Sequence, residues 1–210
     1  MRWLSARSRC TDRLVAVRII RRVVTAGVDP SGFIGRSAEL ARLEAARARA
    51  ETVAGTTVVI GGEAGIGKTR LVEEFARAIT ARGGTVLSGS CLPSGGSSTP
   101  YAPFVEALRG SIRTVEPGRL PALLGPGRRE LARLLPELET GTPAPVATID
   151  PDVHGQARLF EAVLAFLERV SRAGTCLVVV DDLQWADDGT VELLPFLLRN
   201  TRASNSRAWP

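Results

Sequence analysis

The chain has 210 residues, of which 44% are apolar and 5% aromatic. This length suits one domain of about 100–200 residues with short extensions. No apolar run approaches the roughly 20 residues that a membrane-spanning helix needs, so we expect a soluble, cytoplasmic protein with no membrane partner. Three cysteines lie far apart, with no close pair and a single histidine. This pattern excludes a zinc site that could be recognised from ligand spacing.

The positive charge of the chain is concentrated at its start. The formal net charge is +5, and residues 1–28 hold seven arginines and one aspartate. A basic tail can bind nucleic acid or an acidic membrane, but this one has no interleaved aromatic residues. The arginines also interrupt any apolar run, which excludes a signal peptide. We therefore interpret residues 1–30 as a basic, disordered tail, with DNA binding through it as the weaker alternative.

The rest of the chain alternates between apolar strands and amphipathic helices. Residues 31–199 are expected to form one domain, and residues 200–210 a disordered C-terminal tail. β-Branched runs predict strands at 56–60, 85–88 and 176–180. Helical spacing of apolar residues predicts helices at 37–54, 70–82, 104–115, 120–124, 128–135, 153–173 and from about 189, where Pro195 should bend or break the last one. Alternation of this kind predicts a three-layer α/β/α fold around a parallel sheet.

A glycine-rich loop stands between the first of these strands and the following helix. Its sequence is Gly62-Glu63-Ala64-Gly65-Ile66-Gly67-Lys68-Thr69, which matches the P-loop pattern of nucleoside-triphosphate-binding proteins. Glycines let the backbone N–H groups turn toward phosphate oxygens, and the helix that follows directs its positive end at the same phosphates. Lys68, the only lysine in the chain, is expected to contact the β and γ phosphates, and the Thr69 hydroxyl to coordinate Mg²⁺.

The apolar strand at 176–180 ends in two acidic residues, Asp181 and Asp182. In a parallel sheet, the carboxyl ends of the strands share one edge, so these carboxylates should lie beside the P-loop. This is the arrangement of a Walker B site. Asp181 is expected to hold Mg²⁺, and Asp182 to act as the general base toward the attacking water.

Four separated segments resemble one family, the STAND and origin-recognition-complex-like AAA ATPase modules found in large ATP-binding LuxR-type transcriptional regulators. The segments are Phe33-Ile34-Gly35-Arg36, Gly62 to Leu71, Pro100-Tyr101-Ala102-Pro103-Phe104 with Glu106-Ala107-Leu108, and Asp181-Asp182-Leu183-Gln184-Trp185-Ala186-Asp187. The resemblance covers about residues 32–199. It implies ATP and Mg²⁺ as cofactors, and it implies that Ile34, Gly35 and Arg36 lie near the adenine and ribose. For Phe33 and Ile34, covering the core is an equal alternative. Arg70 is included among the expected nucleotide-binding residues. Gln184 and Trp185 are expected near the γ-phosphate, with a packing role for Trp185 as an equal alternative.

The chain departs from the family pattern after the Walker B helix. The resemblance implies a sheet of order 5-1-4-3-2, in which a fourth strand with a polar sensor residue separates the P-loop strand from the Walker B strand. Residues 200–210 offer no such strand, so we expect a truncated domain, incomplete at its C-terminus and without a DNA-binding domain. The P-loop and Walker B strands would then pair directly, or an exposed sheet edge would invite self-association or a protein partner.

Three hypotheses for function follow from the sequence. The first is a Mg²⁺-dependent ATP-binding module of a bacterial LuxR-type or STAND regulator, an ATPase weakened by truncation. The second is a nucleotide-binding fragment that binds ATP or ADP without turnover. The third is a DNA-binding regulator that acts through the basic tail. Measured turnover separates the first two.

Overall fold

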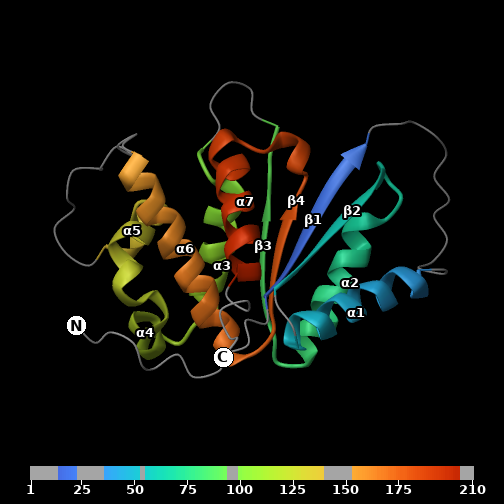
Figure 1. Ribbon diagram of the computed structural model, residues 1–210, viewed down its shortest axis with the longest axis horizontal. Coiled ribbons are helices and arrows are strands. Elements are labelled where there is room, and N and C mark those ends of the chain that lie inside the picture. The colour runs from blue at the N-terminus through green and yellow to red at the C-terminus, as the bar shows by residue number, and fades with distance from the viewer. Residues whose placement is uncertain (1–13, 23–35, 53–54, 94–98, 140–152, 204–210) are drawn as a thin grey trace.

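A single parallel sheet forms the centre of the protein. The computed structural model describes residues 14–22, 36–52, 55–93, 99–139 and 153–203. Within them, the sheet consists of β1 (Leu14–Arg22), β2 (Thr56–Glu63), β3 (Thr85–Ser90) and β4 (Cys176–Asp181). All neighbouring strands are parallel, in the order β2-β1-β4-β3 (Figure 1). The sequence-based prediction of a parallel α/β fold is confirmed.

The helices follow the predicted pattern, with small shifts at their ends. They are α1 (Ser37–Thr52), α2 (Lys68–Ala81), α3 (Ala102–Thr114), α4 (Leu120–Leu124), α5 (Arg128–Ala132), α6 (Val153–Ala173) and α7 (Asp188–Ala203). Of the two effects expected of Pro195, a bend or a break, the break does not occur, because α7 continues through this residue. The same helix extends past residue 199, where the C-terminal tail was expected to begin. Among the described residues, no helix is both long and apolar enough to cross a membrane.

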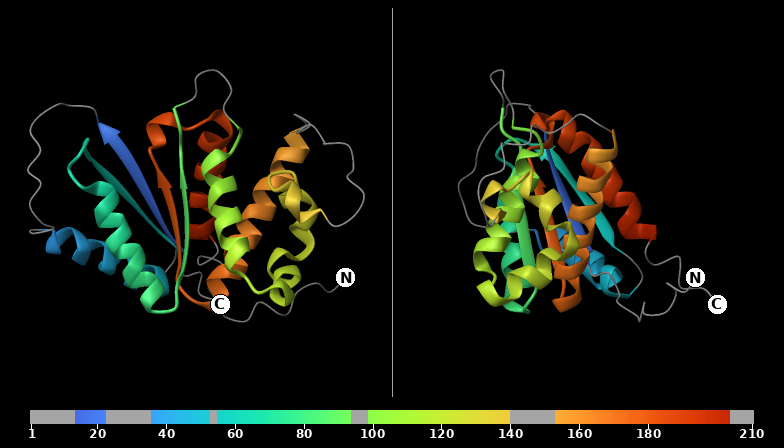
Figure 2. Two further views of the ribbon diagram at one scale, coloured as in Figure 1. Left: turned by 180° about the vertical axis from the view of Figure 1, so that it is seen from behind. Right: turned by 90° about the vertical axis from the view of Figure 1, so that its left-hand side faces the viewer.

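Helices cover both faces of the sheet and form two separate apolar cores. Alternate residues of a strand lie on opposite faces, and β4 shows this clearly. Leu177 and Val179 pack with residues of α1 and α2, whereas Val178 and Val180 pack with residues of α3 to α7. Figure 2 shows the resulting three layers from two further directions. Because both faces of β4 are buried, its sequence is a continuous apolar run rather than an alternating one.

The N-terminal strand β1 corrects two predictions made from the sequence. Residues 14–22 were expected to belong to a disordered tail, but they form a strand at the centre of the sheet. β1 pairs with the P-loop strand β2 on one side and with the Walker B strand β4 on the other. The expected gap is therefore filled, and β2 and β4 do not pair directly. The reason given for self-association, an open edge at this gap, does not apply to the described structure.

Helix α3 crosses β3 at very close range. A Cβ atom added to Gly89 would overlap the backbone of Pro103 in the first turn of α3. Only glycine fits at this position, because backbone atoms cannot move aside as a flexible side chain can. This close approach holds the start of α3 against the carboxyl end of β3, next to the acidic end of β4.

Candidate functional site

The P-loop connects the end of β2 to the start of α2. Gly62 and Glu63 are the last residues of β2, and Lys68 is the first residue of α2. Gly65 and Gly67 take φ values of 79° and 83°, which are left-handed conformations that favour glycine. Glycine permits these conformations at both positions, and the loop leads directly into the N-terminus of α2, where the first backbone N–H groups of a helix have no partner within the helix.

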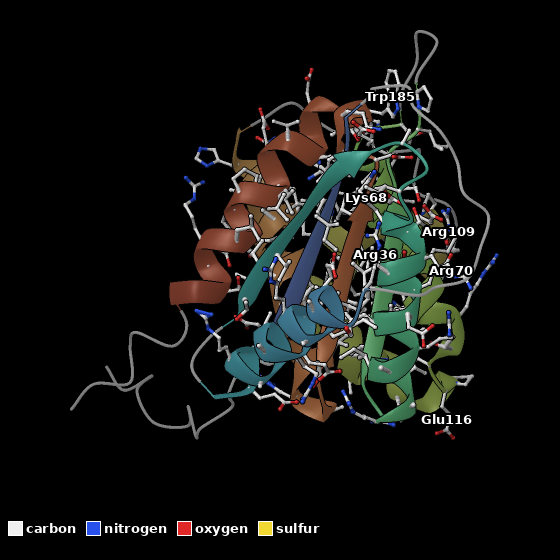
Figure 3. All side chains as sticks on the ribbon, turned by 90° about the vertical axis from the view of Figure 1, so that its right-hand side faces the viewer. Arg36, Lys68, Arg70, Arg109, Glu116 and Trp185 are labelled. Carbon is white, nitrogen blue, oxygen red and sulfur yellow. The ribbon has the colours of Figure 1, made fainter. Side chains whose placement is uncertain are left out.

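Lys68 is held beneath the loop. Its side chain is only 5% exposed. Its ammonium donates hydrogen bonds to the carbonyl oxygens of Gly62, at 2.8 Å, and Glu63, at 2.6 Å. A buried ammonium needs such partners, because a charge without them is costly in the interior. The contacts fix the cation at the point where the loop leaves the sheet (Figure 3).

Thr69 and Asp181 bring the P-loop and the Walker B strand together. The Thr69 hydroxyl lies 3.4 Å from Asp181 Oδ2 and is oriented to donate a hydrogen bond to it. Hydroxyl and carboxylate oxygens are the donors that Mg²⁺ prefers, and Mg²⁺ is usually bound by one or two carboxylates together with phosphate oxygens. Among the described residues, no cluster of three or more His, Cys, Asp or Glu could hold a metal ion by itself. The pair fits a magnesium ion that phosphate groups would also coordinate.

A cleft opens beside this pair, between α2 and the sheet. It has a volume of about 470 Å³. Thr69 and Asp181 line it together with residues of α2, β3 and β4, which are Val72, Glu73, Ala76, Arg77, Val86, Ser88, Ser90 and Val179. The predicted metal ligands are therefore accessible from solvent, and Ser88 and Ser90 of β3 add polar groups to the lining of the cleft.

Asp182, the predicted general base, sits in an unusual backbone conformation. Its φ is 53°, which is uncommon outside glycine but tolerated by Asp and Asn. Its backbone N–H donates to Asp181 Oδ1 at 2.7 Å, and its own Oδ1 accepts a hydrogen bond from Gln184 Nε2 at 3.1 Å. The turn that follows, η4 (Leu183–Trp185), leaves Trp185 49% exposed. Such exposure argues against core packing as the main role of Trp185.

Arg36 contacts the P-loop from the start of α1. Its guanidinium donates a hydrogen bond to the carbonyl oxygen of Ile66, and Figure 3 shows Arg36 and Lys68 in the same region. The structure thus brings Arg36 to the loop, whereas the other two residues expected near the adenine, Ile34 and Gly35, lie outside the described residues. Arg70 is exposed in the first turn of α2.

Asp187 joins two of the segments that carry the family resemblance. Its carboxylate accepts hydrogen bonds from the backbone N–H of Tyr101 at 2.8 Å and of Thr190 at 2.9 Å, and from the Thr190 hydroxyl at 2.7 Å. Burial alone would raise the pKa of Asp187, but these hydrogen bonds, led by that of the Thr190 hydroxyl, lower it. Sequence reasoning gave Asp187 no role. An acidic residue directly before a helix was the available signal, because such a residue commonly caps it.

Cys91 follows β3 and lies close to the carboxylates of Asp181, Asp182 and Asp187. Its backbone N–H donates to the carbonyl oxygen of Asp181 at 3.0 Å. Burial, with smaller contributions from the carboxylates of Asp187, Asp182 and Asp181, raises the pKa of the Cys91 thiol to about 11. The thiol is therefore neutral at physiological pH, and a nucleophilic role for it is not supported.

Comparisons with known proteins identify the family. An uncharacterized protein of Rhizobium meliloti is 30% identical over 158 residues, which covers 67% of this chain and 14% of that relative. The chain thus spans a small part of the relative's length. No solved structure matches the chain. The family model of the AAA ATPase domain matches residues 32–209, so the chain belongs to the AAA ATPase domain family.

Proposed function

We propose that this chain binds ATP together with Mg²⁺ and acts as a nucleotide-dependent switch module of a bacterial regulator of the LuxR or STAND type, with weak or no hydrolysis. The observation that carries the proposal is the 3.4 Å approach of the Thr69 hydroxyl to Asp181, directly beside the buried ammonium of Lys68. Family membership implies nucleotide binding. The regulator context rests on the order of the four family-like segments in the sequence.

Each residue of the site has a separate task in this proposal. Backbone N–H groups of the P-loop and the start of α2 hold the phosphates, and Lys68 neutralises the β and γ phosphates. Thr69 and Asp181 hold Mg²⁺, which supplies further positive charge to the phosphates when bound. Asp182 accepts a proton from the attacking water. Because the Asp182 carboxylate already accepts a hydrogen bond from Gln184, we propose that ATP hydrolysis is slow.

The proposal is tested by nucleotide titration of the purified chain. Calorimetry with ATP and Mg²⁺ is expected to show binding in the natural protein, and Lys68→Ala should weaken it by about tenfold or more, since a charge-assisted contact to phosphate is lost. Arg82→Ala is the matched control, because Arg82 lies at the far end of the same helix, outside the cleft, and its side chain is 54% exposed. Equal ATP affinity in Lys68→Ala and Arg82→Ala would contradict the P-loop assignment.

The DNA-binding alternative receives no support from the described structure. Three of the N-terminal arginines, Arg18, Arg21 and Arg22, belong to β1, which lies inside the sheet between β2 and β4. To bind DNA phosphates as a tail, this segment would have to leave the sheet.

A further inference from the structure

The turn that follows the Walker B acids is held at both ends by residues next to β3 and α3. β3 and β4 are neighbours in the sheet (Figure 1). At the start of the turn, the carbonyl oxygen of Asp181 accepts the backbone N–H of Cys91, which follows β3, at 3.0 Å. At its end, the carboxylate of Asp187 accepts the backbone N–H of Tyr101, which precedes α3, at 2.8 Å. Because β3 and the start of α3 approach each other closely, these two anchor points are fixed relative to one another.

Tyr101 contacts the start of α7 through its ring as well as through its backbone. The ring is buried, and a Cβ atom added to Gly189 would lie 2.7 Å from it. The backbone φ is 62° at Tyr101 and 53° at Asp182, where the turn begins. Among the described residues, no other residue besides glycine has a positive φ. Such conformations persist where the surrounding contacts determine them, so the contacts of Asp187 and Tyr101 set the shape of this turn.

The shape of the turn decides the orientation of the metal ligand Asp181. Its Oδ1 accepts the backbone N–H of Asp182 at 2.7 Å, and its Oδ2 lies 3.4 Å from the Thr69 hydroxyl. A peptide unit is planar, so this N–H keeps its direction only while the turn that begins at Asp182 keeps its conformation. One carboxylate oxygen is thereby held by the backbone, and the other is turned toward Thr69 and the proposed magnesium site.

We propose that Asp187 is a positioning residue for magnesium, which holds the turn 182–186 in the conformation that directs Asp181 at the metal. The proposal rests on the Mg²⁺-dependent ATP binding proposed above. Both carboxylate oxygens of Asp187 are engaged: Oδ1 accepts the N–H groups of Tyr101 and Thr190, and Oδ2 accepts the Thr190 hydroxyl. Groups that orient a metal ligand raise metal affinity, because the ligand does not have to be ordered when the ion binds.

The test separates magnesium binding from the stability of the fold. ATP affinity is measured by calorimetry in Mg²⁺ and in a chelator for the natural chain, Asp187→Ala and Asp187→Asn, and thermal unfolding confirms that each variant is folded. Asp187→Ala is expected to weaken ATP binding in Mg²⁺ on the order of tenfold, and to change binding in the chelator little. Asparagine can still accept both backbone N–H groups, and its amide can donate to the Thr190 hydroxyl. Asp187→Asn should therefore retain the magnesium dependence.

Two further variants distinguish positioning from general stability. Asp187→Ser keeps a cap for α7, but its shorter side chain is expected not to reach the N–H of Tyr101. It should repeat the loss of magnesium dependence in a protein that remains stable. Leu197→Val removes volume from the buried face of the same helix, far from the turn. It should lower the unfolding temperature and leave the magnesium dependence unchanged.

The outcomes that overturn the proposal differ from those that overturn the proposed function. Equal losses of ATP affinity in Mg²⁺ and in the chelator for Asp187→Ala and Asp187→Ser would show a purely structural role. A full magnesium effect in these two variants, or its loss in Asp187→Asn or Leu197→Val, would also overturn the proposal. No ATP binding by the natural chain, or binding without any magnesium dependence, would instead overturn the proposed function itself.

Discussion

The hydroxyl of Thr69 and the carboxylate of Asp181 lie 3.4 Å apart, although 112 positions separate them in the sequence. One residue belongs to the first turn of α2 and the other ends β4. Their approach follows from the parallel sheet, which brings the carboxyl ends of β2 and β4 to one edge with only β1 between them. This contact connects the P-loop part of the proposed site with its Walker B part.

We predict that removing the Thr69 hydroxyl abolishes the magnesium dependence of ATP binding. Thr69→Ala should lower ATP affinity in Mg²⁺ on the order of tenfold, because one oxygen ligand is lost, and affinity in a chelator should change little. Thr69→Ser keeps the hydroxyl and serves as the control. Titrations with and without Mg²⁺ measure the effect. If Thr69→Ala keeps the full difference between the two conditions, the residue is not a metal ligand.

The role of Asp182 can be separated from binding by a substitution that preserves its backbone. Asp182→Asn should bind ATP with unchanged affinity but lose any measurable phosphate release, because the amide cannot accept the proton of the attacking water. Asparagine tolerates the φ of 53° as aspartate does, and its carbonyl can still accept the Gln184 hydrogen bond. Phosphate release is compared with that of Lys68→Ala as background. Turnover in Asp182→Asn equal to the natural rate would refute the assignment as general base.

Asp187 is predicted to stabilise the fold rather than to bind nucleotide. Asp187→Ala removes the helix cap of α7 and the hydrogen bond to Tyr101, and should lower the free energy of unfolding by about 1–2 kcal/mol at pH 7. The exposed neighbour Asp188→Ala is the control and should have a smaller effect. Denaturant titration measures both.

The contribution of Asp187 should also depend on pH. Because the pKa of Asp187 is lowered in the folded protein from its ordinary value of 3.8, its stabilisation is present above that value. It is lost as the pH falls through the folded pKa, where the carboxylate becomes protonated. The difference in unfolding free energy between the natural chain and Asp187→Ala should therefore shrink below about pH 4. A difference that stays constant down to pH 3 would contradict this account.

Alanine substitutions at two glycines are predicted to change the stability of the protein in opposite directions. Gly89→Ala should leave the protein unstable or insoluble, because the new Cβ overlaps the Pro103 backbone. Gly110→Ala should raise the free energy of unfolding by about 0.5–1 kcal/mol, since Gly110 lies inside α3 with open space around it. Thermal unfolding of both variants provides the measurement. A stable, folded Gly89→Ala protein would show that α3 does not approach β3 as closely as described.

The features that sequence reasoning predicted well depend on short stretches of the chain. The P-loop lies between a β-branched strand and an amphipathic helix. The continuous apolar run that ends in Asp181 directly predicts a buried strand. Both signals are local, so spacing and periodicity suffice to find them. Their meeting at one edge follows from the general rule for parallel sheets.

The strand β1 was missed because its sequence carries conflicting signals. Valines and isoleucines favour a strand, but Arg18, Arg21 and Arg22 made the segment look like part of a basic tail. Its place between β2 and β4 is also not a local property, since one partner follows it closely and the other lies near the opposite end of the described chain. Asp187 was missed for a related reason, because its partner Tyr101 comes from a distant segment.

The position of β1 has a consequence for how the protein folds. Among the described strands, β1 comes first in the chain and lies inside the sheet, whereas its partner β4 comes last. Pairing of such distant segments raises the contact order and slows folding, because the entropy of closing a long loop must be overcome first. Until β4 has been made, β1 has only one of its two described partner strands, β2, and its other edge stays open to wrong partners. We expect folding to be limited by the arrival of β4 at this open edge.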